Sequence, residues 1–403
     1  MYVIQPPLLI IAATVVGALL LGYLFSRPPF AKPLLGVLVG GIAGLLGSSL
    51  FMVPLNFCAL EAERSPADHI TGLLLMLLGF GLLVWAGKWG LTRFLKGERL
   101  IPYSEYLPGS FSGRWAGLIA FLFLLPTAVI LIVFNYLPMA QTFQYATLLA
   151  RFGTPKTKFV CLNNFTSLLY DPAYLHSFLL SFIFAAGIVI IGLSLSLLIA
   201  TMAYQPVKGA RIYRSFLIWP YALSPIVVGT IFQLLLNNSA GIINHILEKS
   251  IGIKVPWLLD PTIAPLTIIL TAVWNLIGFN ILFYIAGLQN VPKDLLEAAS
   301  IDGANAFQRF FQVTFPLLAP FTFFLVVTNS IYAFFETFGL VRVLTNGGPL
   351  GTTSTAMYNV YLLGIEGKDL GRSAAQSIIL LAVVIGITII QFRVSNKTVT
   401  YGA

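Results

Sequence analysis

Nine segments of the chain are long and apolar enough to cross a lipid bilayer, and this feature restricts the possible folds more than any other. A membrane-crossing helix needs about 20 predominantly apolar residues. Of all residues, 58% are hydrophobic and 9% are charged, whereas soluble proteins carry about 25% charged residues. The sequence therefore predicts an all-α integral membrane protein with about nine transmembrane helices, at residues 8–25, 34–54, 70–87, 116–138, 178–203, 215–236, 262–286, 319–341 and 374–392.

The basic residues lie in the loops and predict the orientation of the chain. Cytoplasmic loops carry an excess of Lys and Arg. The residues that fill alternate loops are Arg27, Lys32, Lys88, Arg93, Lys96, Arg99, Arg114, Lys208, Arg211, Arg214, Lys293, Arg309, Arg393 and Lys397. Placing them in the cytoplasm puts the N-terminus outside and the C-terminus inside, with exceptions such as Arg151 and Arg342. The net charge of +9 thus reflects topology rather than nucleic-acid binding.

A linker from Phe94 to Arg114, broken by glycines and prolines, is the best domain boundary. It divides the chain into residues 1–115, with three segments, and residues 116–403, with six. The second segment carries Gly36, Gly40 and Gly44 at four-residue spacing, a face that allows close helix approach. Packing within the chain is favoured over an assembly surface for this face.

Residues 290–320 form a polar, helix-prone connection between two apolar segments. Pro292 suits the first position of a helix, and Asp294 and Glu297 lie where the positive end of the helix dipole favours acids. An apolar face comes from Leu295, Leu296, Ala298, Ala299 and Ile301. A loop with this much local structure predicts a docking partner.

Asp302-Gly303 predicts a break after this helix, because glycine enters the left-handed region without a steric cost. A second short helix is expected over residues 304–313, and it carries Phe307, Phe310 and Phe311. Pro316 then marks the return to the membrane.

The motif Glu297-Ala298-Ala299, followed by Gly303 and by Val313-x-Phe315-Pro316, resembles the cytoplasmic EAA loop of ABC-importer permeases. That family usually ends the loop with an isoleucine and a leucine–proline pair, so Val313 and Phe315 are mild departures. The alternative is an ordinary amphipathic surface helix. The resemblance implies a coupling helix that fits a groove on an ATP-binding subunit, with Glu297, Ala298, Ala299, Asp302, Gly303 and Pro316 as its characteristic residues.

Further motifs between Leu118 and Arg393 resemble carbohydrate-type permeases, the family of maltose, glycerol-phosphate and other sugar importers. They are Leu124-Leu125-Pro126, Tyr136-Leu137-Pro138, Asn163-Asn164-Phe165 with Asp171-Pro172, the run from Phe216 to Pro225, and Leu344-Thr345-Asn346-Gly347-Gly348-Pro349. In the last motif Asn346 replaces the usual glycine, and asparagine also tolerates left-handed geometry.

The resemblance implies a six-helix type I importer core over residues 116–403, with three added helices before it. It also implies a bacterial inner-membrane location and alternating access driven by an ATPase dimer. Further implied partners are a second, distinct permease subunit and an external solute-binding protein. Bracing that second subunit is the expected role of the three added helices.

No chemistry of its own is expected in the chain. It lacks the Gly-x-x-x-x-Gly-Lys-Ser/Thr loop that cradles phosphates, and Gly367-Lys368 has neither the upstream spacing nor the following hydroxyl. ATP and Mg²⁺ are therefore expected on the partner ATPase, with no cofactor here. The scattered residues Cys58, Cys161, His69, His176 and His245 predict no metal site.

Six residues are candidates for the solute pathway: Trp274, Asn275, Asn280, Asn329, Tyr332 and Glu336. Glu336 is the only ionisable residue inside the predicted segments, and a carboxylate at that depth usually lines a cavity or has a partner. Asn329 and Tyr332 share its helical face. An aromatic ring and amides of this kind hold sugars. The alternatives are a loop-pinning role for Glu336 and interhelical hydrogen bonds for the others.

An ion-coupled secondary transporter is the main rival, but it normally needs several buried carboxylates or a broken helix pair. The solute class stays open among sugars, polyols, glycerol phosphate and glycosylated osmolytes.

Overall fold

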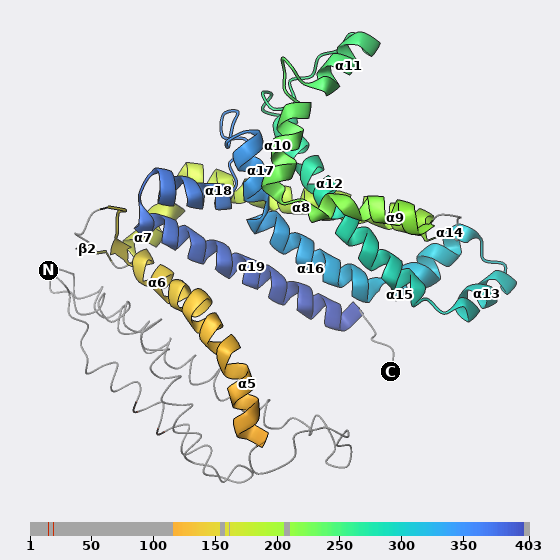
Figure 1. Ribbon diagram of the computed structural model, residues 1–403, viewed down its shortest axis with the longest axis horizontal. Coiled ribbons are helices and arrows are strands. Elements are labelled where there is room, and N and C mark those ends of the chain that lie inside the picture. Colours follow the sequence, from red (N-terminus) through yellow and green to blue (C-terminus); the bar gives the residue numbers. More distant parts are fainter. Residues whose placement is uncertain are drawn as a thin grey trace. The chain divides into compact units, whose positions relative to one another are not determined.

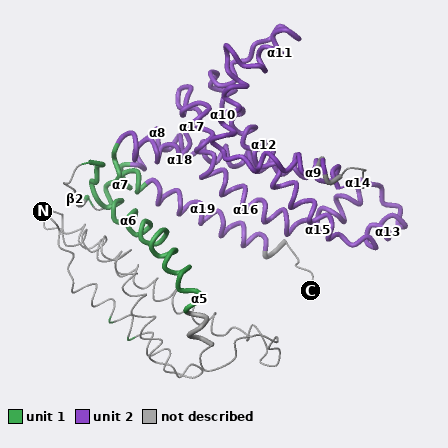
Figure 2. Tube along the Cα trace, in the orientation of Figure 1, with its two compact units in different colours: residues 1–167, 368–375 green, residues 168–367, 376–403 purple. Residues whose placement is uncertain are grey.

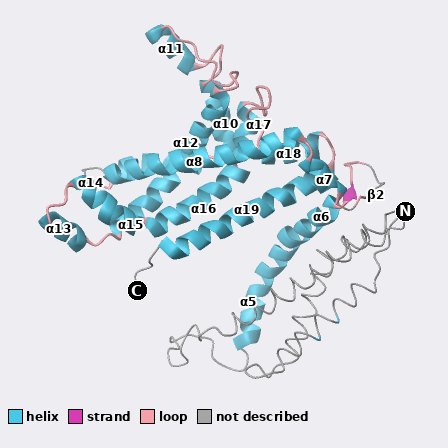
Figure 3. Ribbon diagram, turned by 180° about the vertical axis from the view of Figure 1, so that it is seen from behind, coloured by secondary structure: helices cyan, strands magenta, loops and turns pink. Residues whose placement is uncertain are grey.

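The computed structural model describes residues 116–398, apart from 154–157, 161 and 205–209, and the two isolated positions Val15 and Leu19 (Figure 1). This described part consists of helices joined by loops, with one pair of two-residue strands (Figure 3). The prediction of an all-α membrane protein is therefore confirmed.

Several predictions fall on residues that the structure does not describe. Three of the nine predicted helices lie in this part, so the count of nine stays a prediction. The features outside the described residues are the predicted segments 34–54 and 70–87, segment 8–25 apart from Val15 and Leu19, the Phe94–Arg114 linker, the Gly36, Gly40 and Gly44 face, and Cys58, His69 and Cys161.

The chain divides into two compact units, coloured separately in Figure 2. The first comprises residues 1–167 and 368–375, and the second comprises residues 168–367 and 376–403. This division lies within the predicted six-helix core. The predicted boundary at 115/116 falls at the edge of the described residues and stays a prediction.

In the first unit, a continuous helical stretch from α5 to α6 leads into a small hairpin. Its elements are α5 (Ala116–Leu131), η2 (Ile132–Tyr136), α6 (Leu137–Ala146), β1 (Leu148–Leu149), β2 (Lys158–Phe159) and most of α7 (Asn163–Leu169). The Asn164 amide donates to the carbonyls of Ala146 at 2.9 Å and Leu148 at 3.0 Å, which fixes the turn after α6.

The second unit is a helical bundle. Its elements are α8 (Pro172–Ala203), α9 (Ala210–Ile218), η3 (Trp219–Ala222), α10 (Pro225–Leu235), α11 (Ile242–Ile251), α12 (Ile263–Gln289), α13 (Lys293–Ile301), α14 (Ala306–Arg309), η4 (Phe310–Thr314), α15 (Phe315–Leu317), α16 (Ala319–Phe335), α17 (Thr337–Leu344), α18 (Ala356–Tyr361), η5 (Leu362–Glu366) and most of α19 (Leu370–Thr398).

Helix α12 is the centre of this bundle, because it contacts α8, α9, η3, α10, α16 and α17. Two buried apolar clusters hold the bundle together. One contains Phe184, Ile188, Ile268 and Leu380, and the other contains Tyr284, Ile281, Leu318 and Leu325. Both clusters include residues of α8 and α12, so these two helices run through both parts of the core.

The observed spans are longer than the sequence predicts. By length and composition, five described helices can cross a membrane: Leu122–Ala146, Pro172–Ala203, Ile263–Gln289, Ala319–Leu344 and Leu370–Ser395. Each therefore extends beyond its predicted segment at one end or at both, by the most at the end of the first, which reaches Ala146 rather than residue 138. Helix α8 starts at Pro172 rather than at residue 178. There Asp171 caps the helix by accepting from the amides of Ala173 at 3.0 Å and Tyr174 at 3.4 Å, and Pro172 fills the first position.

The segment predicted at 215–236 is not one continuous helix. The chain here forms two helical arms, Arg214–Ala222 and Pro225–Leu235, that are bent by 101°. Pro220 and Pro225 each lack an N–H group, and Leu223 and Ser224 adopt extended backbone conformations between the arms. This bent pair is a sixth crossing if it counts as one span.

Candidate functional site

The first helix of the 290–317 loop, α13, is placed close to where the sequence predicts it. The helix starts at Lys293, and Pro292 is its N-cap with φ −63° and ψ 127°, so the prediction of Pro292 as the first helical residue is wrong by one position. None of the α13 side chains is buried. Leu295 is 47% exposed and Ile301 is 86% exposed, so these two residues of the predicted apolar face stay largely uncovered, whereas Leu296 and Ala299 are half-buried.

The break between the two loop helices is a left-handed turn at Gly303. Gly303 has φ +83°, and a Cβ placed on it meets nothing within 4 Å. The amide of Ala304 donates to the Ala299 carbonyl at 3.0 Å and closes the end of α13. Backbone conformation, rather than space, is therefore what requires glycine here.

The second helix starts and ends later than predicted. Asn305 and Gln308 form a reciprocal capping box with two bonds of 2.9 Å, so α14 begins at Ala306 rather than 304. The helical stretch then continues past 313 through η4 and α15, because Pro316 sits early in α15, where its missing N–H is tolerated.

The loop presents apolar side chains on its outer surface. Phe307 is 71% exposed and Phe311 is 49% exposed, and their ring centroids are 4.4 Å apart. Arg309 donates to the Ser300 hydroxyl at 2.6 Å and so ties the second helix to the first. The structure thus brings both loop helices into one ordered, exposed surface.

Inside the bundle, Asn280 of α12 and Asn329 of α16 form a closed pair. Each amide donates to the other, at 3.0 Å and 2.8 Å, and both residues are 0% exposed. Gly192 of α8 faces this pair, since a Cβ on it would lie 3.9 Å from the Asn280 amide nitrogen and 4.0 Å from the Asn329 oxygen. This geometry is that of an interhelical hydrogen bond.

Asn275 and Tyr332 form a second link between the same helices. The Tyr332 hydroxyl donates to Asn275 Oδ1 at 2.8 Å, and Asn275 Nδ2 donates to the carbonyl of Pro220 at 2.9 Å. Trp274 is 37% exposed and packs edge-on against Phe232 with ring centroids 5.2 Å apart. The structure thus connects three of the candidate pathway residues to the bent pair.

Glu336 lies at the junction of α16 and α17, where it is both the last cap of one helix and the first cap of the next. Its side chain is exposed. The observed span Ala319–Leu344 also contains Arg342, so Glu336 is not the only ionisable residue in this span. The prediction of a lone charge was wrong because the span extends further than 341.

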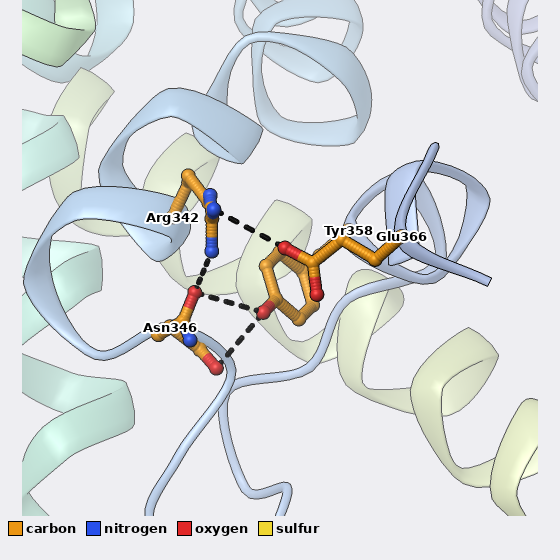
Figure 4. A network of polar contacts seen from close by, with 4 residues as sticks. All are labelled: Arg342, Asn346, Tyr358 and Glu366. Atoms are coloured by element: carbon orange, nitrogen blue, oxygen red, sulfur yellow. Dashed lines mark hydrogen bonds and ion pairs between the residues drawn. The ribbon is translucent and has the colours of Figure 1, made fainter. Parts of the chain in front are cut away.

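A polar cluster that the sequence did not single out surrounds the turn after α17. Arg342 pairs with Glu366 at 3.1 Å and donates to the Asn346 side chain (Figure 4). Its guanidinium also lies 5.1 Å from the centre of the Tyr361 ring. The Tyr358 hydroxyl donates to the Asn346 carbonyl at 2.9 Å. Burial and the nearby Glu366 carboxylate raise the pKa of Tyr358 above its usual 10.0.

Asn346 and Gly347 have φ values of +53° and +79°, so the left-handed geometry predicted for Asn346 is confirmed. The only sequence signal for the remaining cluster was an arginine beside an apolar span. Its partners come from a segment about one helix further along the chain, and the sequence pattern did not connect them.

Comparison with known proteins agrees with the fold. Residues 192–399 match the family model described as "Binding-protein-dependent transport system inner membrane component". The chain is 41% identical over 285 residues to the sn-glycerol-3-phosphate transport system permease protein UgpA of Agrobacterium fabrum, covering 71% of this chain and 97% of that protein. The chain belongs to this permease family.

A second relative agrees with this assignment, and a solved structure has the same fold. The UgpA protein of Yersinia enterocolitica is 40% identical over 299 residues, which cover 74% of this permease and 99% of the relative. One chain of a bacterial alginate ABC transporter, in complex with an alginate pentasaccharide-bound periplasmic protein, superposes with a TM-score of 0.64 at 20% identity. That match covers 72% of this permease and 99% of the other chain.

The permease is thus a membrane component of a carbohydrate-type ABC importer. Among the described residues, no group of His, Cys, Asp or Glu is placed to hold a metal ion. The described site consists of an exposed loop of two short helices and a set of amides that form hydrogen bonds between helices.

Proposed function

We propose that this permease imports sn-glycerol 3-phosphate or a closely related carbohydrate-like solute by alternating access. The observation that carries the proposal is the 41% identity to a permease of that name over 97% of its length. Permeases this similar share the shape of their solute pathway over nearly all of the core. Sugars, polyols and glycosylated osmolytes are the wider class from which the solute is drawn.

In this proposal the 290–317 loop docks on a separate ATPase dimer, which binds ATP and Mg²⁺. The support is the exposure of both loop helices, including Glu297, together with Leu295, Ile301 and Phe307. Exposed apolar side chains on an ordered helix pair are typical of a protein-docking surface. The loop motif, Glu297-Ala298-Ala299 with Asp302, Gly303 and Pro316, supports the same role.

The remaining partners are a second, distinct permease subunit and an external solute-binding protein, in the bacterial inner membrane. Family membership supports both, since the family is named for its dependence on a binding protein. The placement of basic residues supports an N-terminus outside and a C-terminus in the cytoplasm. Residues 1–115 would then brace the second subunit.

Among the candidate pathway residues, Glu336 and Trp274 are the two whose side chains are exposed in this chain. They are the better candidates for solute contact. Asn275, Asn280, Asn329 and Tyr332 already have hydrogen-bond partners between helices, which favours a structural role for those four.

The test is to purify the tagged permease with its partners from native membranes, reconstitute the complex in liposomes and measure uptake of labelled sn-glycerol 3-phosphate. Competition with sugars and polyols then ranks the solutes. We expect an ATPase and a second permease to co-purify, and uptake to require ATP. Uptake by the isolated chain, driven by an ion gradient without ATP, would replace this function with secondary transport.

A further inference from the structure

The bend between α9 and α10 takes two backbone carbonyls out of regular helical hydrogen bonding. The Pro220 carbonyl accepts the Leu223 amide at 3.3 Å, and the Leu223 carbonyl has no backbone donor among the described residues. Leu223 is extended, with φ −90° and ψ 137°, and Ser224 accepts the Val227 amide with its side chain at the start of α10. An unpaired carbonyl within a membrane is costly, because lipid offers no donor. The bent pair therefore needs donors from a neighbouring helix.

One side chain supplies them. Asn275 Nδ2 donates to the carbonyl of Pro220 at 2.9 Å and to that of Leu223 at 3.2 Å, so a single amide spans the break. Asn275 is 2% exposed. Tyr332 fixes the orientation of this amide by donating to its oxygen at 2.8 Å.

Helix α12 also contacts both arms of the bent pair directly. At Gly278, an added Cβ would lie 2.8 Å from the Cα and carbonyl oxygen of Ile218, so the backbones of α12 and α9 touch. On the other arm, Trp274 packs against Phe232 of α10. One turn of α12 thus holds α9, the break and α10.

The same helix leads directly into the 290–317 loop. Helix α12 ends at Gln289, and the loop returns to the bundle as α16, which carries Tyr332. A displacement of the loop therefore reaches Asn275 by two routes. One is α12, which carries Asn275, and the other is α16, whose Tyr332 donates a hydrogen bond to Asn275. No other contact is needed to connect the loop to the bent pair.

We propose that Asn275 and Gly278 form a clamp through which α12 sets the angle of the α9–α10 bend and changes it when the 290–317 loop moves. These two are positioning residues for transport, and Tyr332 supports them. The inference rests on the proposed ATP-driven function, because the loop must be moved by an ATPase.

The experiment measures the bend in the complete complex. Cys58→Ser and Cys161→Ser provide a background without native cysteines, and spin labels are placed through Phe216→Cys on α9 and Leu234→Cys on α10, which are 70% and 68% exposed. Electron paramagnetic resonance then gives the distance between labels in nanodiscs, with and without ATP and vanadate. The complex is the one purified with its native partners.

In the parent complex we expect the distance to shift with nucleotide. Asn275→Leu keeps the size of the side chain and removes the donor, so the shift should disappear and the solute imported per ATP hydrolysed should fall about tenfold. Tyr332→Phe should reduce the shift less. Thr328→Val is the matched control, because the Thr328 hydroxyl bonds only within its own helix, to Phe324 at 3.1 Å and Leu325 at 3.2 Å.

An Asn275→Leu complex that keeps the full nucleotide-dependent shift would overturn the proposal, as would a parent complex that hydrolyses ATP without any shift. If Asn275→Leu fails to insert, Tyr332→Phe decides, and an unchanged shift counts against the clamp. A normal shift without uptake of sn-glycerol 3-phosphate would refute the solute assignment alone and support the clamp.

Discussion

Asn280 and Asn329 donate hydrogen bonds to each other across the interface of α12 and α16, although 49 positions separate them in the chain. Asn329 Nδ2 also donates to the Leu325 carbonyl of its own helix at 2.8 Å. Since both side chains are fully buried, the pair fixes the register of the two helices that flank the 290–317 loop. Leucine at either position would leave the other amide without its partner.

Breaking this pair should destabilise the bundle. Asn280→Leu alone, or Asn329→Leu alone, should lower the free energy of unfolding by about 1–3 kcal/mol, because each leaves at least one polar atom of the remaining buried amide without a partner. The double variant should lose less free energy of unfolding than the two single variants together, since both polar groups are then gone. Unfolding by SDS titration in mixed micelles measures this, with Thr230→Val as an exposed control. Strictly additive effects would show that the pair is not coupled.

Two glycines in the same bundle should respond differently to alanine. At Gly192 an added Cβ would be 3.6 Å from Val273, an ordinary contact, so Gly192→Ala should be close to neutral. At Gly278 it would be 2.8 Å from backbone atoms of Ile218 that cannot turn away, so Gly278→Ala should cost about 1–3 kcal/mol. The same unfolding titration compares the two. Equal stability of both variants would contradict the close approach of α9 and α12.

Gly303 should tolerate asparagine better than valine. Its φ of +83° is a left-handed conformation that asparagine adopts far more readily than a β-branched residue. We expect Gly303→Asn to keep most ATP-dependent uptake and Gly303→Val to lose it, while both proteins stay inserted because the position is exposed. Co-purification of the ATPase is the second measurement. If the Gly303→Val variant keeps full ATPase binding and uptake, the left-handed turn is not required for transport.

The Tyr358 hydroxyl should hold the turn after α17 until strongly alkaline pH. The pKa of Tyr358 is raised in the folded state. Its contribution to the stability of the folded protein is therefore complete below the unfolded pKa of 10.0 and is lost as the pH rises through the folded pKa. Thermal stability of the parent protein should therefore fall at alkaline pH more than that of Tyr358→Phe. Identical pH profiles for the two proteins would show that this hydroxyl does not contribute.

The Arg342–Glu366 pair should contribute little to stability. Its side chains are 37% and 40% exposed, and pairs of this kind are worth about 0–1 kcal/mol. Glu366→Gln should accordingly change the free energy of unfolding by less than about 1 kcal/mol, and raising the salt concentration should reduce that change further. A larger loss of free energy of unfolding in Glu366→Gln would mean that the carboxylate has a role beyond this exposed pair.

Much of the architecture was predictable because it depends on local sequence. Apolar length located the five long helices and the segment that forms the bent pair, and the first loop helix followed from Pro292, its first-turn acids and Gly303. Asn346 was correctly predicted as left-handed because that preference belongs to the residue itself. The ends of the spans were less accurate, since caps such as Asp171 act outside the apolar run.

The sequence by itself determined that this chain is a helical membrane protein with a polar, helix-forming loop between two long apolar segments, since apolar length, charge placement and turn residues act over a few positions. Only the tertiary structure decided that residues 215–236 bend by 101°. It also decided that Asn275, Asn280, Asn329 and Tyr332 form hydrogen bonds between helices instead of facing an open solute pathway. The physical reason is that lipid provides no hydrogen-bond donors or acceptors. Each buried amide must find its partner on another helix, and which helix that is depends on packing.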